Sequence, residues 1–184
     1  MGEASGLIKH FTVNQVVFNQ GEYNSLEKEF IKELEKKNIE YIQSINQIIL
    51  SKNTFYFLND KLYNDENDNS IVLYTDFNGI KFLLMGDAGK SVEANISVNP
   101  TLQNIDFLKV GHHGSNTSTS KSFVEIVNPI HSIISVGKNN RYGHPTAEVI
   151  ENLKNTNIYR TDKDGTIKIE IKKGKAKIKT YGNT

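Results

Sequence analysis

The chain has 184 residues, of which 37% are apolar and 23% are charged, and its formal net charge is +1. This length allows one hydrophobic core, and the near-neutral charge gives no reason to expect a partner densely coated with negative charge. The absence of cysteine excludes a disulfide scaffold, a thiolate metal site and a cysteine nucleophile, so any metal ion must be bound by histidine, aspartate or water.

Membrane and export signals are not found in the sequence. No apolar run approaches the roughly 18 to 20 residues that a membrane span needs, and the N-terminus lacks the apolar segment of a signal peptide. We therefore expect a soluble, cytoplasmic chain in which residues 1–184 form a single domain.

The predicted elements alternate between helices and short strands. Residues 25–38 have the apolar spacing of an amphipathic helix with Ser25 as its N-cap. Strands are expected at 54–58, 70–75, 80–85 and 105–110, and Asn78-Gly79 predicts a tight hairpin turn between the second and third. Helices at 121–127 and 146–153 are each followed by a strand, at 132–136 and 158–161. The chain closes with a hairpin of 166–171 and 176–180, in which lysines alternate with isoleucines.

Asp87 follows the apolar strand 82–85, and Gly86 lets the backbone turn there. A carboxylate at the end of a strand projects from the rim of the sheet, where α/β folds place their chemistry. Such a carboxylate can bridge two metal ions. The alternative is an ordinary turn or cap residue.

His112 and His113 follow the strand 105–110 and are flanked by glycines, which allow a ligand to approach the backbone. Adjacent strand positions point to opposite faces, so one histidine is expected to face the site and the other to support it. Ser115 begins a run of small polar residues that can hold a phosphate or, equally, cap a helix.

His144 lies in a loop after the strand 132–136 and immediately before a helix, where a neutral imidazole is a good metal ligand. It can instead cap the helix or be solvated. Arg141 in the same loop is a candidate for phosphate recognition, because a guanidinium matches phosphate oxygens bidentately, or it is a surface side chain. His10 and His131 are expected to be surface or packing residues.

Taken together, these motifs resemble a known family. From about residue 67 to 171, the chain closely resembles the metallo-β-lactamase-fold domain of the ComEC DNA-uptake (competence) proteins. The segments that carry the resemblance are Met85-Gly86-Asp87, Lys109-Val110-Gly111-His112-His113-Gly114-Ser115 and Arg141-Tyr142-Gly143-His144-Pro145.

The resemblance implies a four-layer αββα sandwich and metal-dependent hydrolysis of DNA or another phosphodiester. Asp87 would be the bridging metal ligand and His144 the last histidine ligand, while His112 and His113 would make catalytic contacts to the substrate or transition state. Two divalent ions, zinc or manganese, would lie about 3.5 to 4 Å apart in the complete fold. Asn67 and Asn69 would stand where many proteins of this fold have a histidine. Asn69, together with Ser115 and Arg141, is a substrate-binding candidate.

The sequence also departs from this family. The motif His-x-His-x-Asp-His is absent, and His10 is the only histidine before residue 112. Because the chain opens with residues typical of the segment after that motif, we expect an N-terminally incomplete metallo-β-lactamase sandwich. An upstream half or a membrane channel component would then be its partner.

Three functions remain open. The first is the metal-dependent phosphodiesterase completed by the upstream motif. The second is a truncated, non-catalytic module that binds a polyanion or a protein partner through the strand-end residues and the lysines of 167–179; lysines on one face would favour it. The third is a hydrolase of a small ester or lactone, since one fold hosts many chemistries.

Overall fold

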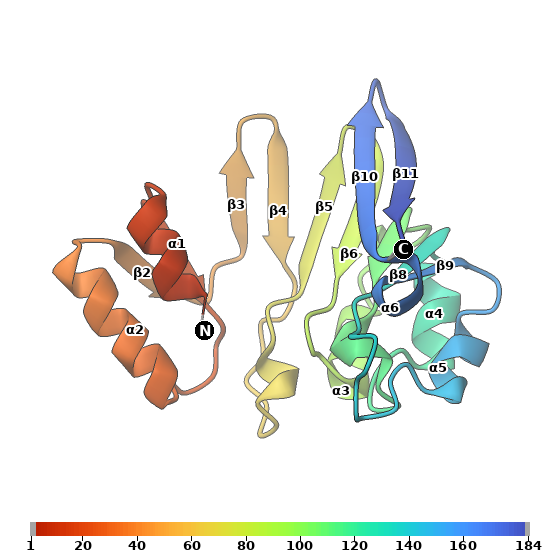
Figure 1. Cartoon of the computed structure of the whole chain (residues 1–184), viewed down its shortest axis with the longest axis horizontal. Helices are drawn as coiled ribbons and strands as arrows, with labels where there is room; N and C mark the ends of the chain where they lie inside the picture. Colours follow the sequence, from red (N-terminus) through yellow and green to blue (C-terminus); the bar gives the residue numbers. More distant parts are fainter. Residues whose placement is uncertain (1–2, 183–184) are drawn as a thin grey trace.

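The structure is a computed structural model that describes residues 3–182. Figure 1 shows an N-terminal unit beside a large sheet. The buried apolar side chains form two separate clusters, one in each of these parts. Residues 1–184 were expected to form a single domain, and the described residues bury their apolar side chains in these two clusters.

The N-terminal unit contains α1 (Ala4–His10), β1 (Gln15–Phe18), α2 (Ser25–Lys36) and β2 (Glu40–Gln43), with β1 and β2 paired in parallel. Helix α2 confirms the predicted helix, but its N-cap is Asn24 rather than Ser25. The Asn24 side chain accepts from the Glu27 N–H at 3.0 Å, and the Glu27 carboxylate accepts from the Asn24 N–H at 2.9 Å. This reciprocal capping box satisfies two amide groups that the helix itself leaves unpaired.

The large sheet has seven strands in the order β3-β4-β5-β6-β7-β8-β9. Strands β3 to β6 form an antiparallel meander and β6 to β9 are parallel. The Asn78-Gly79 turn between β5 and β6 is confirmed, with positive φ at both residues, as a type I′ hairpin requires. The strand bounds are β3 (Gln47–Leu50), β4 (Asn53–Phe57), β5 (Leu73–Phe77), β6 (Ile80–Leu84), β7 (Phe107–Lys109), β8 (His131–Ile134) and β9 (Asn157–Arg160).

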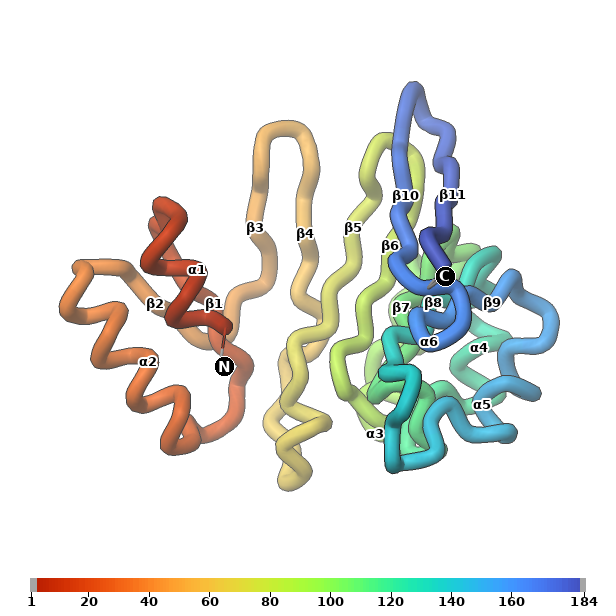
Figure 2. Tube along the Cα trace, viewed as in Figure 1, coloured from red at the N-terminus to blue at the C-terminus, as the bar shows by residue number. Residues whose placement is uncertain are grey.

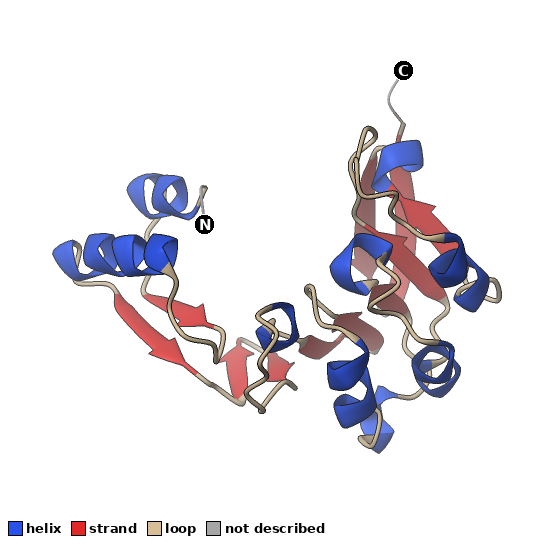
Figure 3. Cartoon of the chain, turned by 90° about the horizontal axis from the view of Figure 1, so that it is seen from below, coloured by secondary structure: helices blue, strands red, loops and turns tan. Residues whose placement is uncertain are grey.

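Three helices cover one face of this sheet: α3 (Lys90–Ile96), α4 (Lys121–Val127) and α5 (Ala147–Asn152). Leu83, Leu108 and Ile134 from three adjacent strands are fully buried in the same cluster as Phe123 and Val149 from the helices. Three short 3₁₀ turns, η1 (Asn67–Asn69), η2 (Pro100–Leu102) and η3 (Gly111–Gly114), lie in the connections. The right-hand part of Figure 3 shows the helices packed along the sheet.

The chain ends in α6 (Thr161–Asp164) and the hairpin of β10 (Thr166–Lys172) and β11 (Lys175–Tyr181), which form a separate two-stranded sheet. Figure 2 shows the traced path of the hairpin, which overlaps the region of β5 and β6 in this view. At its turn, a Cβ added to Gly174 would lie 3.4 Å from the carbonyl oxygen of Asn78. The hairpin turn therefore packs against the β5–β6 turn.

The mixed sheet and its helices confirm the expected α/β class. The seven-stranded sheet with α3, α4 and α5 on one face forms one β layer and one α layer of the expected sandwich. Within residues 3–182, no helix is both long and apolar enough to cross a membrane.

Candidate functional site

The candidate site lies at the carboxyl ends of β6, β7 and β8. Because these strands are parallel neighbours, their carboxyl ends meet at the same edge of the sheet, where α/β proteins bind ligands. Asp87 follows β6, His112 and His113 follow β7, and His144 lies in the connection that leaves β8. The structure therefore brings together the four residues predicted to be catalytic or metal-binding.

Asp87 is positioned by a tight turn. Gly86 has φ +58°, and a Cβ on it would lie 3.0 Å from the Ser70 Cβ and 3.2 Å from the Ile71 carbonyl oxygen, so the turn accommodates only glycine without displacement. The Asp87 N–H donates to the Ser70 hydroxyl at 3.1 Å, and its side chain is 47% exposed. The carboxylate is thus held at the rim and open to solvent.

His112 and His113 have a strained backbone. Their φ values are 43° and 55°, and Gly114 follows with φ +83°. Non-glycine residues in this region cost about 1 to 3 kcal/mol each, and such strain is found mainly where function requires an unusual geometry. The strand geometry does not persist into this turn, so the expectation that the two side chains point to opposite faces does not apply.

The His113 ring is oriented by a backbone carbonyl. Its Nδ1 lies 2.6 Å from the Ser135 carbonyl oxygen. Because a carbonyl can only accept, Nδ1 carries the proton, and in the neutral ring the Nε2 lone pair is free. Nε2 lies 4.0 Å from an Asp87 carboxylate oxygen. His113 therefore presents a free imidazole nitrogen beside the carboxylate.

The backbone of His144 is held by two hydrogen bonds to the side-chain amide of Asn140. Its N–H donates to the Asn140 side-chain oxygen at 2.9 Å, and its carbonyl accepts from the Asn140 amide at 2.8 Å. Its Nδ1 is buried without a hydrogen-bond partner among the described residues. Burial, and then the neighbouring His112 and His113, lower the pKa of His144. A lowered pKa favours the neutral form of the ring, whose unprotonated nitrogen can bind a metal ion.

The three histidines pack as a group. The ring centroids of His112 and His144 are 6.0 Å apart and those of His112 and His113 are 6.3 Å apart. His112 Nδ1 lies 3.3 Å from the Thr117 hydroxyl. A depression of ≈ 230 Å³ adjoins Asp87 and His112 and approaches the size of small-ligand sites.

The three predicted substrate contacts are placed differently. Ser115 is buried, and its hydroxyl accepts from Thr117 Oγ1 at 3.0 Å. Asn69 is buried, and its amide makes two bonds to the Tyr63 backbone, at 2.8 and 3.0 Å. Arg141 is exposed, with its guanidinium 5.4 Å from the Tyr142 ring centroid. Ser115 and Asn69 thus organise their own loops, and Arg141 is the one whose polar end remains open to a ligand.

The other two histidines are placed as expected. His131 stacks on Phe107 at 4.9 Å and lies at the first residue of β8, the opposite end of the strand from the site. His10 is exposed at the end of α1.

No role was predicted for two residues that support the site, although Lys109 lies in one of the segments that carry the resemblance. Burial lowers the pKa of Lys109, at the end of β7, while the charge of Asp87 opposes that shift. Glu93 on α3 is 1% exposed, and its carboxylate accepts the N–H groups of Thr119 and Ser120. Two features of the sequence could have indicated these residues. Lys109 is the only lysine in the apolar run 105–110, and Glu93 lies between the apolar residues of α3.

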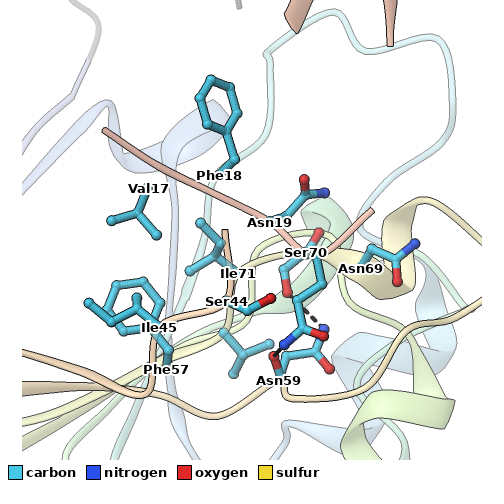
Figure 4. Close-up of a pocket in the computed structure, with 12 residues that line it drawn as sticks. Val17, Phe18, Asn19, Ser44, Ile45, Phe57, Asn59, Asn69, Ser70 and Ile71 are labelled. Carbon is cyan, nitrogen blue, oxygen red and sulfur yellow. Dashed lines mark hydrogen bonds between the residues drawn. The ribbon is translucent and has the colours of Figure 1, made fainter. Parts of the chain in front are cut away.

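A second hollow lies between the N-terminal unit and the large sheet (Figure 4). Phe18 and Asn19 line it from one side and Asn59 and Ser70 from the other, with the Asn59 amide donating to the Ser70 carbonyl at 2.9 Å. Its volume of ≈ 20 Å³ is far below that of ligand sites. We therefore regard it as a packing crevice.

The site is incomplete as a metal centre. Within residues 3–182, no three His, Asp or Glu side chains come together in the way needed to hold a metal ion, whereas a catalytic zinc ion has three protein ligands. The donor types do suit a divalent ion, since the His144 Nδ1 is an unpaired buried atom and Asp87 is an open carboxylate. The described residues can supply part of a ligand set but not the whole.

Comparison with known proteins gives consistent relatives, although no family model matches the chain. Over 180 residues, 94% of the chain, it is 33% identical to ComE operon protein 3 of Bacillus subtilis. It is 33% identical to Competence protein ComA of Neisseria gonorrhoeae over 117 residues, 61% of the chain. It is 41% identical to Recombination protein 2 of Haemophilus influenzae over 88 residues, 48% of the chain.

A similar solved structure is that of a proposed Zn-dependent hydrolase of the metallo-β-lactamase superfamily from Thermotoga maritima. The identity is 19% and the TM-score 0.40, and the alignment covers 66% of this chain and 61% of that one.

The fold and the strand-end site define a mixed α/β protein with a carboxylate and three histidines at one sheet edge. The chain is a homologue of the ComEC family of competence proteins. It spans 23% of the length of the B. subtilis relative and 17% of the N. gonorrhoeae relative.

Proposed function

We propose that this chain forms part of a metal-dependent phosphodiesterase that hydrolyses DNA during DNA uptake. The observation that carries the proposal is the convergence of Asp87, His112, His113 and His144 at the carboxyl edge of parallel strands. The homology to competence proteins supports DNA as the substrate class.

The side chains suit phosphoryl chemistry in distinct ways. His113, with its Nδ1 proton held by Ser135, can accept or hold a proton at Nε2 next to Asp87. His112 lies at the edge of the depression and can contact a phosphate oxygen, as can the exposed guanidinium of Arg141. These roles use only groups that the chain itself provides.

Within residues 3–182, the chain supplies only part of a metal ligand set, so hydrolysis by the chain itself should be slow and should need added metal ion. Asp87 and His144 would be its contributed ligands, and the remaining ligands would come from another segment or chain. A bound zinc or manganese ion would neutralise charge on the reacting phosphate and supply a nucleophile at neutral pH. No step above depends on that ion.

The experiment is a hydrolysis assay with bis(p-nitrophenyl) phosphate and single-stranded DNA, each with added Mn²⁺ or Zn²⁺. Asp87→Asn and His144→Gln should each lower the rate about tenfold or more. The matched controls are Asp60→Asn and His10→Gln, which change exposed residues outside the site and should leave the rate unchanged. Equal rates in the site variants and the wild type would contradict the proposal, and hydrolysis of esters or lactones in place of phosphodiesters would reassign the substrate.

A second candidate is a non-catalytic binding module. It is favoured by the lack of three converging metal ligands within residues 3–182. Elemental analysis of the purified chain separates the two functions: near-stoichiometric metal that is lost in Asp87→Ala and His144→Ala supports the phosphodiesterase. Metal-free wild-type protein that binds DNA without hydrolysing it supports the binding module.

A further inference from the structure

The positive charge of this chain is concentrated in its last hairpin. Residues 166–181 contain six lysines and one glutamate, a net charge of +5, whereas the whole chain has a net charge of +1. The rest of the chain is therefore net negative. The near-neutral net charge of the whole chain gave no reason to expect a polyanionic partner, but it is the sum of a positive hairpin and a net negative remainder.

The register of the hairpin places these lysines on one face. Lys168 pairs with Lys179, Glu170 with Lys177 and Lys172 with Lys175 across β10 and β11. The intervening positions carry Ile167, Ile169, Ile171 and Ile178, which are half-buried. Since residues directly opposite each other share a face of the sheet, one face consists of lysines with Glu170 and the other is apolar.

The outer part of the lysine face is free of internal ion pairs. Glu170 binds Lys179 at 2.9 Å and Lys168 at 3.0 Å, near the base of the hairpin. Lys172, Lys175 and Lys177 are exposed and make no ion pair with any residue in the described part of the chain. These three charges are available to a partner.

The base of the hairpin is joined to the candidate site. Thr161, at the start of α6, accepts from the Val136 N–H and donates to the Val136 carbonyl, both at 2.8 Å. Val136 is adjacent to Ser135, whose carbonyl holds the His113 ring. From this base, β10 rises away from the site edge (Figure 1), and its seven residues extend about 20 Å.

The chemistry of this face favours a phosphate polymer over other partners. Protein interfaces are depleted in lysine and enriched in aromatic side chains. An apolar face that inserts into a membrane must be exposed, whereas the isoleucines opposite these lysines are half-buried. Apart from Tyr181 at the base, the lysine face has only lysines, Glu170 and Thr166. Lysines spaced about 6.8 Å apart along a strand suit repeated phosphates.

We propose that the lysine face of β10–β11 binds the phosphate backbone of a DNA strand and guides it toward the edge of the sheet that carries Asp87 and His113. This inference rests on the proposed function for the identity of the polymer, and it extends that function by assigning the surface that holds the substrate outside the site. It requires no catalysis by the chain itself.

The test is fluorescence anisotropy of a labelled single-stranded oligonucleotide titrated with the full chain at several salt concentrations. The variant carries Lys172→Gln, Lys175→Gln and Lys177→Gln, and the matched control carries Lys32→Gln, Lys36→Gln and Lys37→Gln, three exposed lysines on and next to α2. We expect the hairpin variant to bind about tenfold more weakly or worse, with a salt slope shallower by about 2. The control should bind like the wild type.

A second variant moves affinity in the opposite direction. Glu170→Gln removes the carboxylate that occupies Lys168 and Lys179, so it should tighten DNA binding and steepen the salt slope. A variant that unfolds would lose affinity for DNA. A gain of affinity in Glu170→Gln therefore shows that the hairpin binds DNA and does not merely stabilise the fold.

Three outcomes would overturn the inference: an unchanged salt slope in the hairpin variant, an equal loss in the α2 control, or weaker binding in Glu170→Gln. If the hairpin variant binds DNA like the wild type but no longer binds vesicles of phosphatidylcholine and phosphatidylserine, the lysine face binds a lipid surface instead.

Hydrolysis of bis(p-nitrophenyl) phosphate is measured in parallel. If the wild type binds DNA through the hairpin but does not hydrolyse the phosphodiester, only the proposed phosphodiesterase function is contradicted. If the wild type hydrolyses it and the hairpin variant binds DNA as the wild type does, only the hairpin inference is contradicted.

Discussion

Glu93 shows how a single buried carboxylate shapes the site loop. It is almost fully buried on α3 and accepts the N–H groups of Thr119 and Ser120, which follow the His112-His113 turn. Burial raises the pKa of Glu93, while the hydrogen bonds from Ser120 and Thr119 lower it. The loop is therefore fastened to α3 through backbone bonds rather than through its own side chains.

Replacing Glu93 should destabilise the protein. Glu93→Ala leaves two amide donors unpaired and creates a cavity, which should lower the free energy of unfolding by about 2 to 4 kcal/mol. Urea denaturation measures this change. Glu148→Ala is the control, because Glu148 is exposed and its ion pair with Lys90 lies at the surface, where such a loss is within about 1 kcal/mol. Equal effects of the two variants would show that Glu93 does not fasten the loop.

Glu170 provides a prediction about pH. Its bonds to Lys179 and Lys168 lower the pKa of the Glu170 carboxyl to about 2. Because the folded-state pKa lies below that of the unfolded chain, the stabilisation is present above pH 4.5 and disappears as the pH falls toward about 2. Carbon-13 NMR titration of the side-chain carboxyl should give a midpoint near this low value, and Lys179→Gln should raise it. A midpoint near 4.5 in the wild type would rule out the ion pairs.

At the scale of the elements, the turn after β7 depends on contact with the loop that carries His144. Gly114 has φ +83°, and a Cβ on it would lie 2.5 Å from the Pro145 Cβ. Pro145 follows His144 directly, so the two histidine-bearing loops are packed together at this glycine.

Gly114→Ala should therefore separate His112 from His144. We expect a loss of about 2 to 4 kcal/mol in unfolding free energy, from the positive φ and from the steric clash, together with altered NMR signals of the His144 ring. Gly137→Ala is the matched control, because a Cβ there meets nothing within 4 Å. Unchanged stability in Gly114→Ala would indicate that the loops do not pack in this way.

Several elements could be predicted from local sequence because a local cause specifies them. The Asn78-Gly79 turn identified the β5–β6 hairpin, and the alternation of lysine with isoleucine identified β10 and β11. Helix α3 was missed, because its large apolar residues are only Val92 and Ile96, a single i, i+4 pair that shows no clear period. Strands β1 and β2 were missed because they pair in parallel across the intervening helix α2, which leaves no local signal. Strand β3 was also missed, although it pairs with its neighbour β4.

The site was predictable in part for similar reasons. Asp87, His112, His113 and His144 stand next to glycines at strand ends, and this local signal is visible in the sequence. The role of Glu93 depends on contacts with Thr119 and Ser120, which are distant in the chain. The bonds of Asn69 to Tyr63 depend on the path of their shared loop. Neither leaves a periodic pattern.

At the scale of the whole molecule, two hydrophobic cores share one chain. Leu34 is fully buried in the N-terminal cluster, and Leu83 is fully buried in the cluster of the large sheet. Polar bonds between the two parts include Gln20 to the Asn59 carbonyl at 3.0 Å. The crevice of Figure 4 lies at this boundary.

This division predicts that the two cores respond separately to mutation. Leu34→Ala should destabilise its cluster by about 2 to 5 kcal/mol and raise amide hydrogen exchange in α2 and β1, with little change in β6 to β8. Leu83→Ala is the counterpart and should raise exchange in the large sheet. Uniform loss of protection across the chain in Leu34→Ala would show that the two cores unfold as one unit.

The central claim is that Asp87 and the three histidines act as one site at the strand ends. Its most direct test is titration of the nitrogen-15-labelled chain with Mn²⁺, because the paramagnetic ion broadens amide signals near its binding position even when binding is weak. The account predicts selective broadening around Gly86, Gly111 and Gly143, lost in Asp87→Asn. Broadening that follows the acidic side chains of α2, or that persists unchanged in Asp87→Asn, would contradict it.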